Sequence, residues 1–234
     1  PSVFKDTDAK DEYSLSILGE KYRKRIKKHH ENFVTESDFK WLSQHVELLR
    51  IPIGYWIFGG EKPYIGAIKQ LDWAFKMAKK YELKILIDIH GAPGSQNGLA
   101  HSGRVGECSW LDDETCRVQS LEMTTRIVKR YSENPSFWGI ELLNEPKLTA
   151  KSFWQYISYY KKAKKQITIS NPKLKIFISD WYIPALGLFA ACILKVGLDC
   201  HFYPSFGETK KRSKTEIFRR IKMIKWFLRF ARLL

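Results

Sequence analysis

The feature that most constrains the fold of this chain is a set of five apolar runs that each end in polar side chains. The clearest run is FWGIELL, which is followed directly by Asn144 and Glu145. An apolar stretch of this kind is typical of a strand that is buried on both faces, as in a parallel sheet. The other four runs end in Arg50, in His90, in Asp180, and in the pair His201 and Tyr203.

Stretches with helical periodicity separate these runs. One helical face of residues 66–81 gathers the apolar side chains of Ile68, Leu71, Phe75 and Ala78. Within residues 35–46, Thr35 and Asp38 have the spacing of a capping box. Strands that alternate with helices over short connections predict a parallel sheet with right-handed crossovers. Because reactive side chains follow five successive strands and no GxGxxG or P-loop is present, the pattern favours an α/β chain of the (β/α)8 TIM-barrel type over an open sheet.

The carboxylate of Glu145 is expected where barrel enzymes keep their reactive groups, at the C-terminal end of a strand. A carboxylic acid beside an amide suits sugar chemistry, with Glu145 as the proton donor and Asn144 binding a hydroxyl. Taken alone, the Asn-Glu-Pro string also fits an ordinary strand end that is capped by polar residues.

Four strings in the chain together resemble the exo-1,3-β-glucanase branch of the family 5 glycoside hydrolases. They are LRIPIGYW, IDIHGAPGSQNG with HSGR after it, GIELLNEP and LDCHFYPSF, and they stand in the order of the family over most of the chain. PSVFKDTDAKDEYSLSILGE and VTESDFKWL also resemble the segment ahead of the second barrel strand in that branch. The resemblance implies a retaining β-glucosidase mechanism without a cofactor or a metal, most closely that of a glucan exo-1,3-β-glucosidase.

The resemblance also implies catalytic roles. Glu145 would protonate the leaving oxygen and then activate water, and the first task needs a raised pKa. Asn144 would hydrogen-bond the sugar beside the reacting carbon. Arg50 would keep the nucleophile ionised and Tyr203 would orient it. The polar cradle would be completed by His90 and His201.

Substrate contacts are expected from the loops beyond the strands. Gln96 and Asn97 could bind sugar hydroxyls, and an aromatic at Phe206 resembles the one that flanks the entrance in the family. Leu99 departs from the family, which usually has Phe after GSQNG, and this weakens the expectation of narrow exo-1,3 specificity. The remaining substrate-binding candidates follow strand ends: Trp56 and Trp181 for stacking on a sugar, and Asp180.

Some family strings do not occur in the chain. An Asn-Leu-Gly-Gly-Trp-like first strand would precede Pro1, and the Gly-Glu-Trp string that carries the nucleophile does not follow His201. Glu208 lies too close to Tyr203 for a separate parallel strand, so it is expected in a loop. We therefore expect one partial domain over residues 1–234, with barrel strands two to six identifiable, strands one, seven and eight missing, and no nucleophile. Such a chain would be a fragment or truncated product that is inactive by itself, or a non-catalytic glucan-binding relative.

The charge is unevenly distributed. The net charge is +15, and residues 209–234 hold ten Lys and Arg against one acid. We expect this tail to form a basic amphipathic helix, the one that follows strand six. A helix of this kind could alternatively bind an anionic membrane or nucleic acid. The second basic run, KYRKRIKKHH at residues 21–30, is expected to be a solvated loop, with phosphate binding as the alternative.

The expected partner is a β-glucan or an oligosaccharide, with no nucleic acid, and the completed protein is expected to be a monomer. ALGLFAACILKVGL is too short to span a membrane and is expected to pack inside. No signal peptide is visible, so an extracellular or cell-wall location rests on the resemblance. The four cysteines lack CxxC spacing, so no zinc site is expected, and a Cys108–Cys116 bridge or free thiols stay open.

Overall fold

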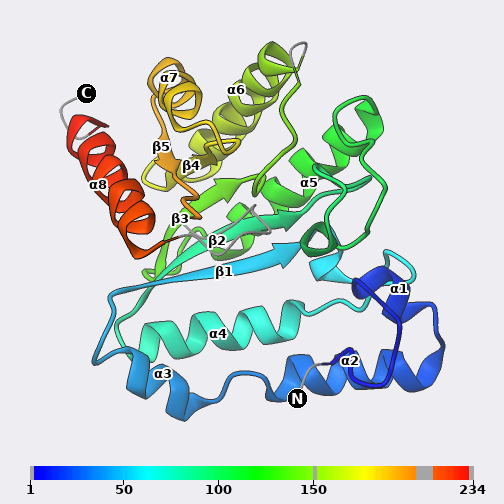
Figure 1. Cartoon of the computed structure of the whole chain (residues 1–234). Helices are drawn as coiled ribbons and strands as arrows, with labels where there is room; N and C mark the ends of the chain where they lie inside the picture. The colour runs from blue at the N-terminus through cyan, green and yellow to red at the C-terminus, as the bar shows by residue number, and fades with distance from the viewer. Residues whose placement is uncertain (1–2, 150–151, 204–212, 232–234) are drawn as a thin grey trace.

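The centre of the molecule is one five-stranded parallel sheet whose strands follow the order of the chain (Figure 1). The computed structural model describes residues 3–149, 152–203 and 213–231. The strands are β1 (Leu48–Gly54), β2 (Lys84–Gly91), β3 (Phe137–Leu142), β4 (Lys175–Ser179) and β5 (Gly197–Asp199). Their number and order confirm the five strands that the apolar runs predict.

A helix lies in each crossover between neighbouring strands, as parallel pairing requires. The crossover helices are α4 (Ile68–Lys80), α5 (Glu114–Tyr131), α6 (Phe153–Ser170) and α7 (Pro184–Leu194). Short 3-10 turns follow the first two strands: η1 (Tyr55–Phe58) and η2 (Ala100–Ser102). These are consecutive strand–helix units of a (β/α)8 barrel, so the predicted fold class is confirmed.

The inner strands are buried and β1 is not. Six of the eight residues of β2 are buried, and five of the six residues of β3. In contrast, burial alternates along β1, which pairs only with β2 among the described strands. Asp88 of β2 lies opposite Glu141 of β3 in the register. Two buried acidic side chains are therefore held side by side on the inner strands of the sheet.

The helices form where the periodicity predicts them. Leu71, Phe75 and Ala78 of α4 are buried in the core, and the helix spans most of the predicted residues 66–81. Helix α3 (Glu36–Leu42) begins at Thr35 with the predicted capping box, in which Asp38 binds the backbone N–H of Thr35. This box satisfies backbone donors that the first turn leaves unpaired.

The prediction of a loop at residues 21–30 is wrong, because α2 (Glu20–Asn32) covers them. Ile26 alone within the helix is buried, so the run has almost no apolar periodicity to mark it. The helix is fixed by contacts that come from elsewhere in the chain. Arg23 donates to the carbonyl of Pro63, and Arg25 donates to the carbonyl of Lys5. The preceding short helix α1 (Glu12–Ser16) packs against it.

The C-terminal part of the described chain contains α8 (Lys214–Ala231), which confirms a helix in the basic tail. Its assignment as the helix after strand six stays a prediction. Glu208 and Phe206 lie outside the described residues. The apolar segment from 185 to 198 forms most of α7, whose buried residues include Ala190, Ala191 and Leu194. All four cysteines are free, so the Cys108–Cys116 bridge is not formed.

Candidate active site

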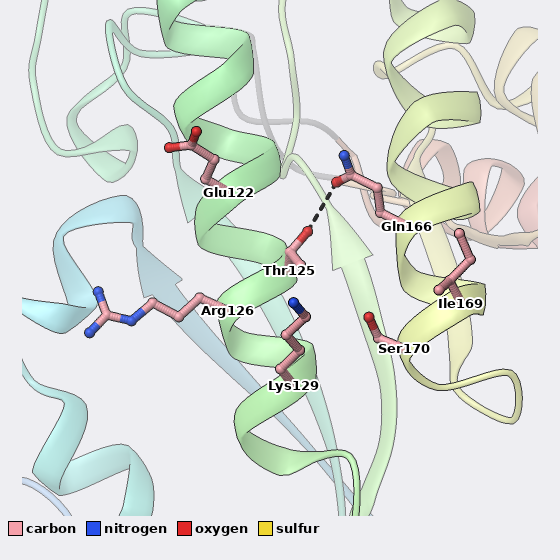
Figure 2. Close-up of a pocket in the computed structure, with 7 residues that line it drawn as sticks. All are labelled: Glu122, Thr125, Arg126, Lys129, Gln166, Ile169 and Ser170. Carbon is pink, nitrogen blue, oxygen red and sulfur yellow. Dashed lines mark hydrogen bonds between the residues drawn. The ribbon is translucent and has the colours of Figure 1, made fainter.

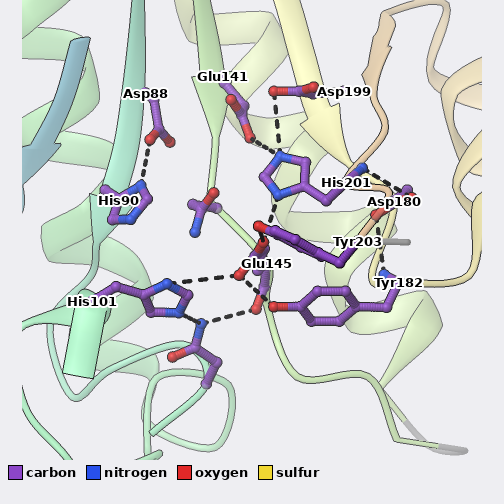
Figure 3. A network of polar contacts seen from close by, with 12 residues as sticks. Asp88, His90, His101, Glu141, Glu145, Asp180, Tyr182, Asp199, His201 and Tyr203 are labelled. Carbon is purple, nitrogen blue, oxygen red and sulfur yellow. Dashed lines mark hydrogen bonds and ion pairs between the residues drawn. The ribbon is translucent and has the colours of Figure 1, made fainter. Parts of the chain in front are cut away.

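The polar side chains that follow the strands converge at one end of the sheet (Figure 3). Arg50 comes from β1, Glu141 comes from β3, and Asn144 and Glu145 come from the loop after β3. The other contributors are Asp88 and His90 from β2, Asp180 and Tyr182 after β4, Asp199 from β5, and His201 and Tyr203 beyond it. This convergence is a consequence of parallel strands, whose C-terminal ends meet at the same edge.

Arg50 lies at the centre of three carboxylates, of which Asp88 and Glu141 are buried and Asp199 is partly exposed. Its Nε lies 2.8 Å from Glu141 Oε2 and 3.3 Å from Asp199 Oδ2, and its Nη1 lies 3.1 Å from Asp88 Oδ2. Its Nη2 also donates to Asn144 Oδ1 at 2.9 Å. Burial and the neighbouring Asp88 carboxylate raise the pKa of Glu141 to about 8, although Arg50 opposes the shift. The guanidinium of Arg50 therefore contacts three carboxylates and the side-chain amide of Asn144, the residue before Glu145.

Glu145 is buried and is held by donors from two different strand ends. Its Oε1 accepts hydrogen bonds from His201 Nδ1 at 2.6 Å and from the Tyr203 hydroxyl at 2.5 Å, while its Oε2 accepts one from the Tyr182 hydroxyl. Burial pushes the pKa of Glu145 up, but the hydrogen bonds from Tyr182, Tyr203 and His201 outweigh it and hold the pKa below its usual value. The raised pKa expected of an acid is therefore not present in this arrangement, because three donors stabilise the carboxylate.

His201 bridges Glu145 and the carboxylate cluster. Its Nε2 lies 3.4 Å from Asp199 Oδ2 and 3.9 Å from Glu141 Oε1, while its Nδ1 bonds Glu145. Burial lowers the pKa of His201, but hydrogen bonds to Asp199 and Glu145 outweigh that effect and raise the pKa to about 9. The His201 imidazolium therefore lies between the carboxylates of Glu145 and Asp199 and can exchange a proton with either of them.

The backbone around Glu145 is in an uncommon conformation. Leu143 and Glu145 have φ values of 60° and 46°, in the left-handed region that non-glycine residues rarely adopt. Leu143 is fully buried and the Asn144 N–H donates to the Ile89 carbonyl at 2.9 Å. Strain of this kind persists where surrounding structure over-determines it and is common at functional sites. Here it turns both Asn144 and Glu145 inward.

Several predicted substrate-binding residues support the scaffold. Gln96 is 2% exposed, and its amide nitrogen donates to the carbonyls of His90 and Asn144, so it has no free donor for a sugar. Trp56 is 8% exposed and stacks on Tyr64, with ring centroids 4.1 Å apart. These two residues hold the loops after β1 and β2, and their contact with a sugar stays a prediction.

Asp180 and Trp181 are buried as well. The Asp180 carboxylate accepts the backbone N–H groups of Tyr182 at 3.0 Å and His201 at 3.3 Å. Trp181 is 3% exposed and lies among the rings of Phe153, Tyr156 and Tyr160. Their side chains fix the turn after β4. Their predicted contacts with a sugar stay predictions.

Other predicted residues do lie at the site. Asn97 donates to the Glu145 carbonyl at 3.0 Å and contacts His101 Nε2 at 2.9 Å, which places it beside the catalytic candidate. His90 Nδ1 lies 2.5 Å from Asp88 Oδ2, and its ring meets that of His101 edge to face. Leu99 is exposed on the same loop.

Five residues of the site are not predicted from the sequence: Asp88, His101, Glu141, Tyr182 and Asp199. Asp88 and Glu141 carried a usable signal, since a charge within a run such as KILIDIHG cannot face the core without a partner. Asp199 and Tyr182 lie close in the sequence to the predicted site residues His201 and Trp181, and nothing in the sequence marks them as site residues. His101 reaches Glu145 only through the fold of its loop, with Nδ1 at 3.6 Å from Oε2.

Glu141, Asp199 and His201 could in principle hold a metal ion, because their ligand atoms lie within 4.8 Å of one another. Arg50 already contacts both of these carboxylates. Its charge accounts for the cluster without a metal ion.

A hollow lies on the outer surface between α5 and α6 (Figure 2). Thr125 and Gln166 form a hydrogen bond of 3.0 Å across it. Its other lining residues are Glu122, Arg126, Lys129, Ile169 and Ser170. None of them belongs to the group around Glu145, so this hollow is not part of the candidate active site.

The sequence profile of the cellulase family, glycosyl hydrolase family 5, matches residues 21–227. This chain belongs to glycosyl hydrolase family 5. Among curated relatives of this family 5 chain, a probable glucan 1,3-beta-glucosidase A of Emericella nidulans is 33% identical over 217 residues, covering 88% of this chain and 53% of the relative. A glucan 1,3-beta-glucosidase of Pichia angusta is 35% identical over 196 residues, covering 79% and 45%. The chain thus spans about half the length of the curated relatives that it matches.

Solved structures confirm the fold. The rutinosidase from Aspergillus niger superposes with a TM-score of 0.75 at 22% identity, covering 86% of this family 5 chain and 63% of the rutinosidase. The beta-glucanase from Saccharophagus degradans gives a TM-score of 0.59 at 18% identity, covering 83% and 58%. Among the described residues of this chain, no helix has both the length and the apolar character to cross a membrane.

Proposed function

We propose that this chain carries the acid/base half of a retaining β-glucan hydrolase, most closely a glucan 1,3-β-glucosidase. The observation that carries the proposal is the placement of Asn144 and Glu145 beyond β3, with Glu145 held by groups that follow β4 and β5. Family membership and the names of the relatives support the reaction class and the substrate.

In the proposed reaction, Glu145 gives a proton to the leaving oxygen and later takes one from water. Asn144 is suited to grip the sugar. Its Oδ1 is fixed by Arg50, and its Nδ2 is buried and has no hydrogen-bond partner within the described part of the chain. A sugar hydroxyl beside the reacting carbon would satisfy this donor, and a buried donor without a partner costs about 1–3 kcal/mol.

The acid step requires that Glu145 become protonated, whereas its pKa is lowered in this structure. A second carboxylate close to Glu145 would raise that pKa, because two like charges at such a distance cannot both ionise easily. Retaining enzymes need this group as the nucleophile, about 5–5.5 Å from the acid. Among the described residues, the carboxylates around Glu145 are already bound. Arg50 contacts Asp88, Glu141 and Asp199, and backbone N–H groups bind Asp180.

We therefore expect the 234-residue chain by itself to bind β-glucan oligosaccharides without hydrolysing them. This keeps glucan binding without catalysis as the second candidate function, favoured because each carboxylate near Glu145 in the described part of the chain already has a partner. Turnover of laminarin or of an activated aryl β-glucoside near 10 per second, a typical enzymatic rate, would contradict this expectation.

The hydrolase proposal is tested in a chimera that joins this chain to the remaining segments of the Emericella nidulans relative. Glu145→Gln should abolish hydrolysis of laminarin, because an alkoxide leaving group needs a proton from the enzyme. With activated aryl glucosides, the rate of the first step should fall less. Added azide should restore turnover by attacking the glycosyl-enzyme directly.

The matched control in the same chimera is Glu36→Gln, a surface carboxylate that contacts Lys80 and Tyr81. It should leave both substrates unaffected. If Glu145→Gln lowers both activities equally in a folded protein and azide does not help, Glu145 is not the acid/base.

The same resemblance to fungal glucosidases supports an extracellular or cell-wall location. We also propose that the complete protein acts as a monomer and without nucleic acid. Sedimentation of the chimera, and its retention on a DNA column at low salt, would test these two points.

A further inference from the structure

Tyr182 lies in the turn after β4 and borders the site from that side (Figure 3). Tyr182 is 49% exposed, and its hydroxyl donates to Oε2 of Glu145. Its ring lies 6.2 Å from that of Tyr203, which reaches Glu145 from beyond β5.

The backbone that presents Tyr182 is strained and is held from two sides. Trp181 and Tyr182 have φ values of 53° and 61°, so two successive non-glycine residues are left-handed. The buried Asp180 carboxylate binds the N–H of Tyr182, and the indole of Trp181 is packed in an aromatic pocket. Such strain is maintained only where the surroundings enforce it. Its result here is that the Tyr182 hydroxyl points at Glu145.

The two oxygens of Glu145 have different supports. Oε1 has two donors, His201 and Tyr203. Oε2 has Tyr182, and the next polar neighbour, His101 Nδ1, is 3.6 Å away and beyond hydrogen-bond distance. Loss of Tyr203 therefore leaves Oε1 with a donor, whereas loss of Tyr182 leaves Oε2 with none among the described residues.

We propose that Tyr182 is a positioning residue for Glu145, whose hydroxyl fixes the orientation of the carboxylate and stabilises its ionised form through Oε2. The role of Glu145 as acid/base rests on the proposed function, but the contact between the two side chains does not. Tyr182 thereby sets how easily Oε2 takes up the proton that a leaving group would need.

The titratable and charged groups that face Glu145 come from several elements, and all of them influence the pKa of its carboxylate. They are Tyr182 after β4, His201 and Tyr203 after β5, His101 from η2 with His90 of β2 against it, and, behind His201, Glu141, Asp199 and Arg50. The hydrogen bonds from the tyrosines and His201 are what lower the pKa of Glu145 against the effect of burial. Their removal one at a time separates the contributions.

The test is a pH titration of the Glu145 carboxylate in the 234-residue chain. Isotope-edited infrared spectroscopy monitors the carboxylate, and the Glu145→Gln spectrum is subtracted to isolate its band. Tyr182→Phe should move the titration midpoint upward by about one pH unit, since a hydrogen bond to a charged group is lost. Tyr203→Phe should move it less, because His201 still binds the same oxygen. Tyr81→Phe removes a matched tyrosine–carboxylate contact with Glu36, outside the site, and should not move it.

Tyr182→Asn gives a second variant that keeps the test decisive if Tyr182→Phe fails to fold. Asn tolerates the left-handed backbone well and is too short to replace the hydroxyl at Oε2, so it should give the same upward shift. A midpoint in both folded variants no higher than that of Tyr81→Phe, or a larger shift in Tyr203→Phe, would overturn the proposal.

In the chimera, Tyr182→Phe should also move the alkaline limb of kcat/KM to higher pH, because that limb reports the acid of the free enzyme. A shifted carboxylate titration with an unshifted activity profile would leave Tyr182 as the group that positions Glu145 and would remove Glu145 from the acid role. The failure of one proposal is thus distinguishable from the failure of the other.

Discussion

At the scale of single residues, Arg50 illustrates how one side chain can hold a site together. Its guanidinium contacts Asp88, Glu141 and Asp199, of which the first two are fully buried. Buried carboxylates without a partner are costly, and removal of one member of a buried pair typically destabilises a protein strongly.

We predict that Arg50→Ala lowers the free energy of unfolding by about 3–5 kcal/mol. The matched control is Arg130→Ala, which breaks the bidentate contact of Arg130 with Asp72 on the surface and should cost about 0–1 kcal/mol. Urea denaturation of both variants measures the difference. Similar losses in the two variants would mean that the buried carboxylates do not depend on Arg50.

His201 predicts a pH dependence of stability. Its pKa is raised to about 9 in the folded chain, against an ordinary value near 6.5, so folding favours its protonated form. The stabilising contribution is therefore complete below pH of about 6.5 and is lost as the pH rises through 9. The raised pKa of Glu141, about 8, acts in the same direction.

We accordingly expect the urea concentration at the unfolding midpoint to decrease as the pH rises from 6.5 to 9. His201→Gln should make this decrease smaller. His45→Gln, at an exposed position of the surface, should keep the slope of the unmodified chain. Midpoints that stay level across this range in the unmodified chain would show that His201 is not held between its two carboxylates.

At the scale of elements, the turn after β4 depends on how closely α7 approaches it. A Cβ atom at Gly187 would lie 2.7 Å from the Cα of Asp180 and 2.9 Å from Leu198 Cδ1. The first of these atoms belongs to the backbone, which cannot move without displacing Asp180 and the strained residues after it. Glycine at this helical position is required by packing rather than by backbone conformation.

Gly187→Ala should therefore destabilise the chain by about 1–3 kcal/mol through overpacking, although alanine favours a helix by about 1 kcal/mol. It should also raise the titration midpoint of Glu145, because Tyr182 is displaced with the turn. Ala185→Ser, at an exposed position of the same helix, serves as the control and should change neither quantity. A Gly187→Ala chain more stable than its parent would contradict the close approach of α7.

At the scale of the whole molecule, the sheet as described has two edges. β1 pairs only with β2 and β5 pairs only with β4, and Leu48 on β1 is 38% exposed. Exposed edge strands with apolar side chains are templates for pairing with another chain.

We predict that the 234-residue polypeptide associates as its concentration rises, and that Leu48→Lys reduces this association. Val118→Lys adds the same charge at a similarly exposed position of α5, far from the edge, and should help less. Sedimentation velocity over a dilution series measures both effects. Equal behaviour of the two variants would indicate that net charge, and not the edge of β1, controls association.

The sequence by itself determined the class of the molecule and much of its site. Buried parallel strands need continuous apolar runs, and their shared C-terminal edge brings together whatever polar groups follow them. For this reason Arg50, His90, Asn144, Glu145, His201 and Tyr203 could be selected from their positions alone, and all six converge in the structure.

Only the tertiary structure decided which polar and aromatic side chains face the site and which support it. Gln96 and Trp181 lie in the loops after β2 and β4, next to Asn97 and Tyr182. Gln96 is buried by its hydrogen bonds to the carbonyls of His90 and Asn144, and Trp181 is buried among the rings of α6. Asn97 and Tyr182 instead reach Glu145. The pKa of Glu145 was likewise fixed by donors that are 37 to 58 residues away in the chain. Local sequence specifies the period and the end of each element, whereas side-chain direction beyond a strand depends on contacts between elements.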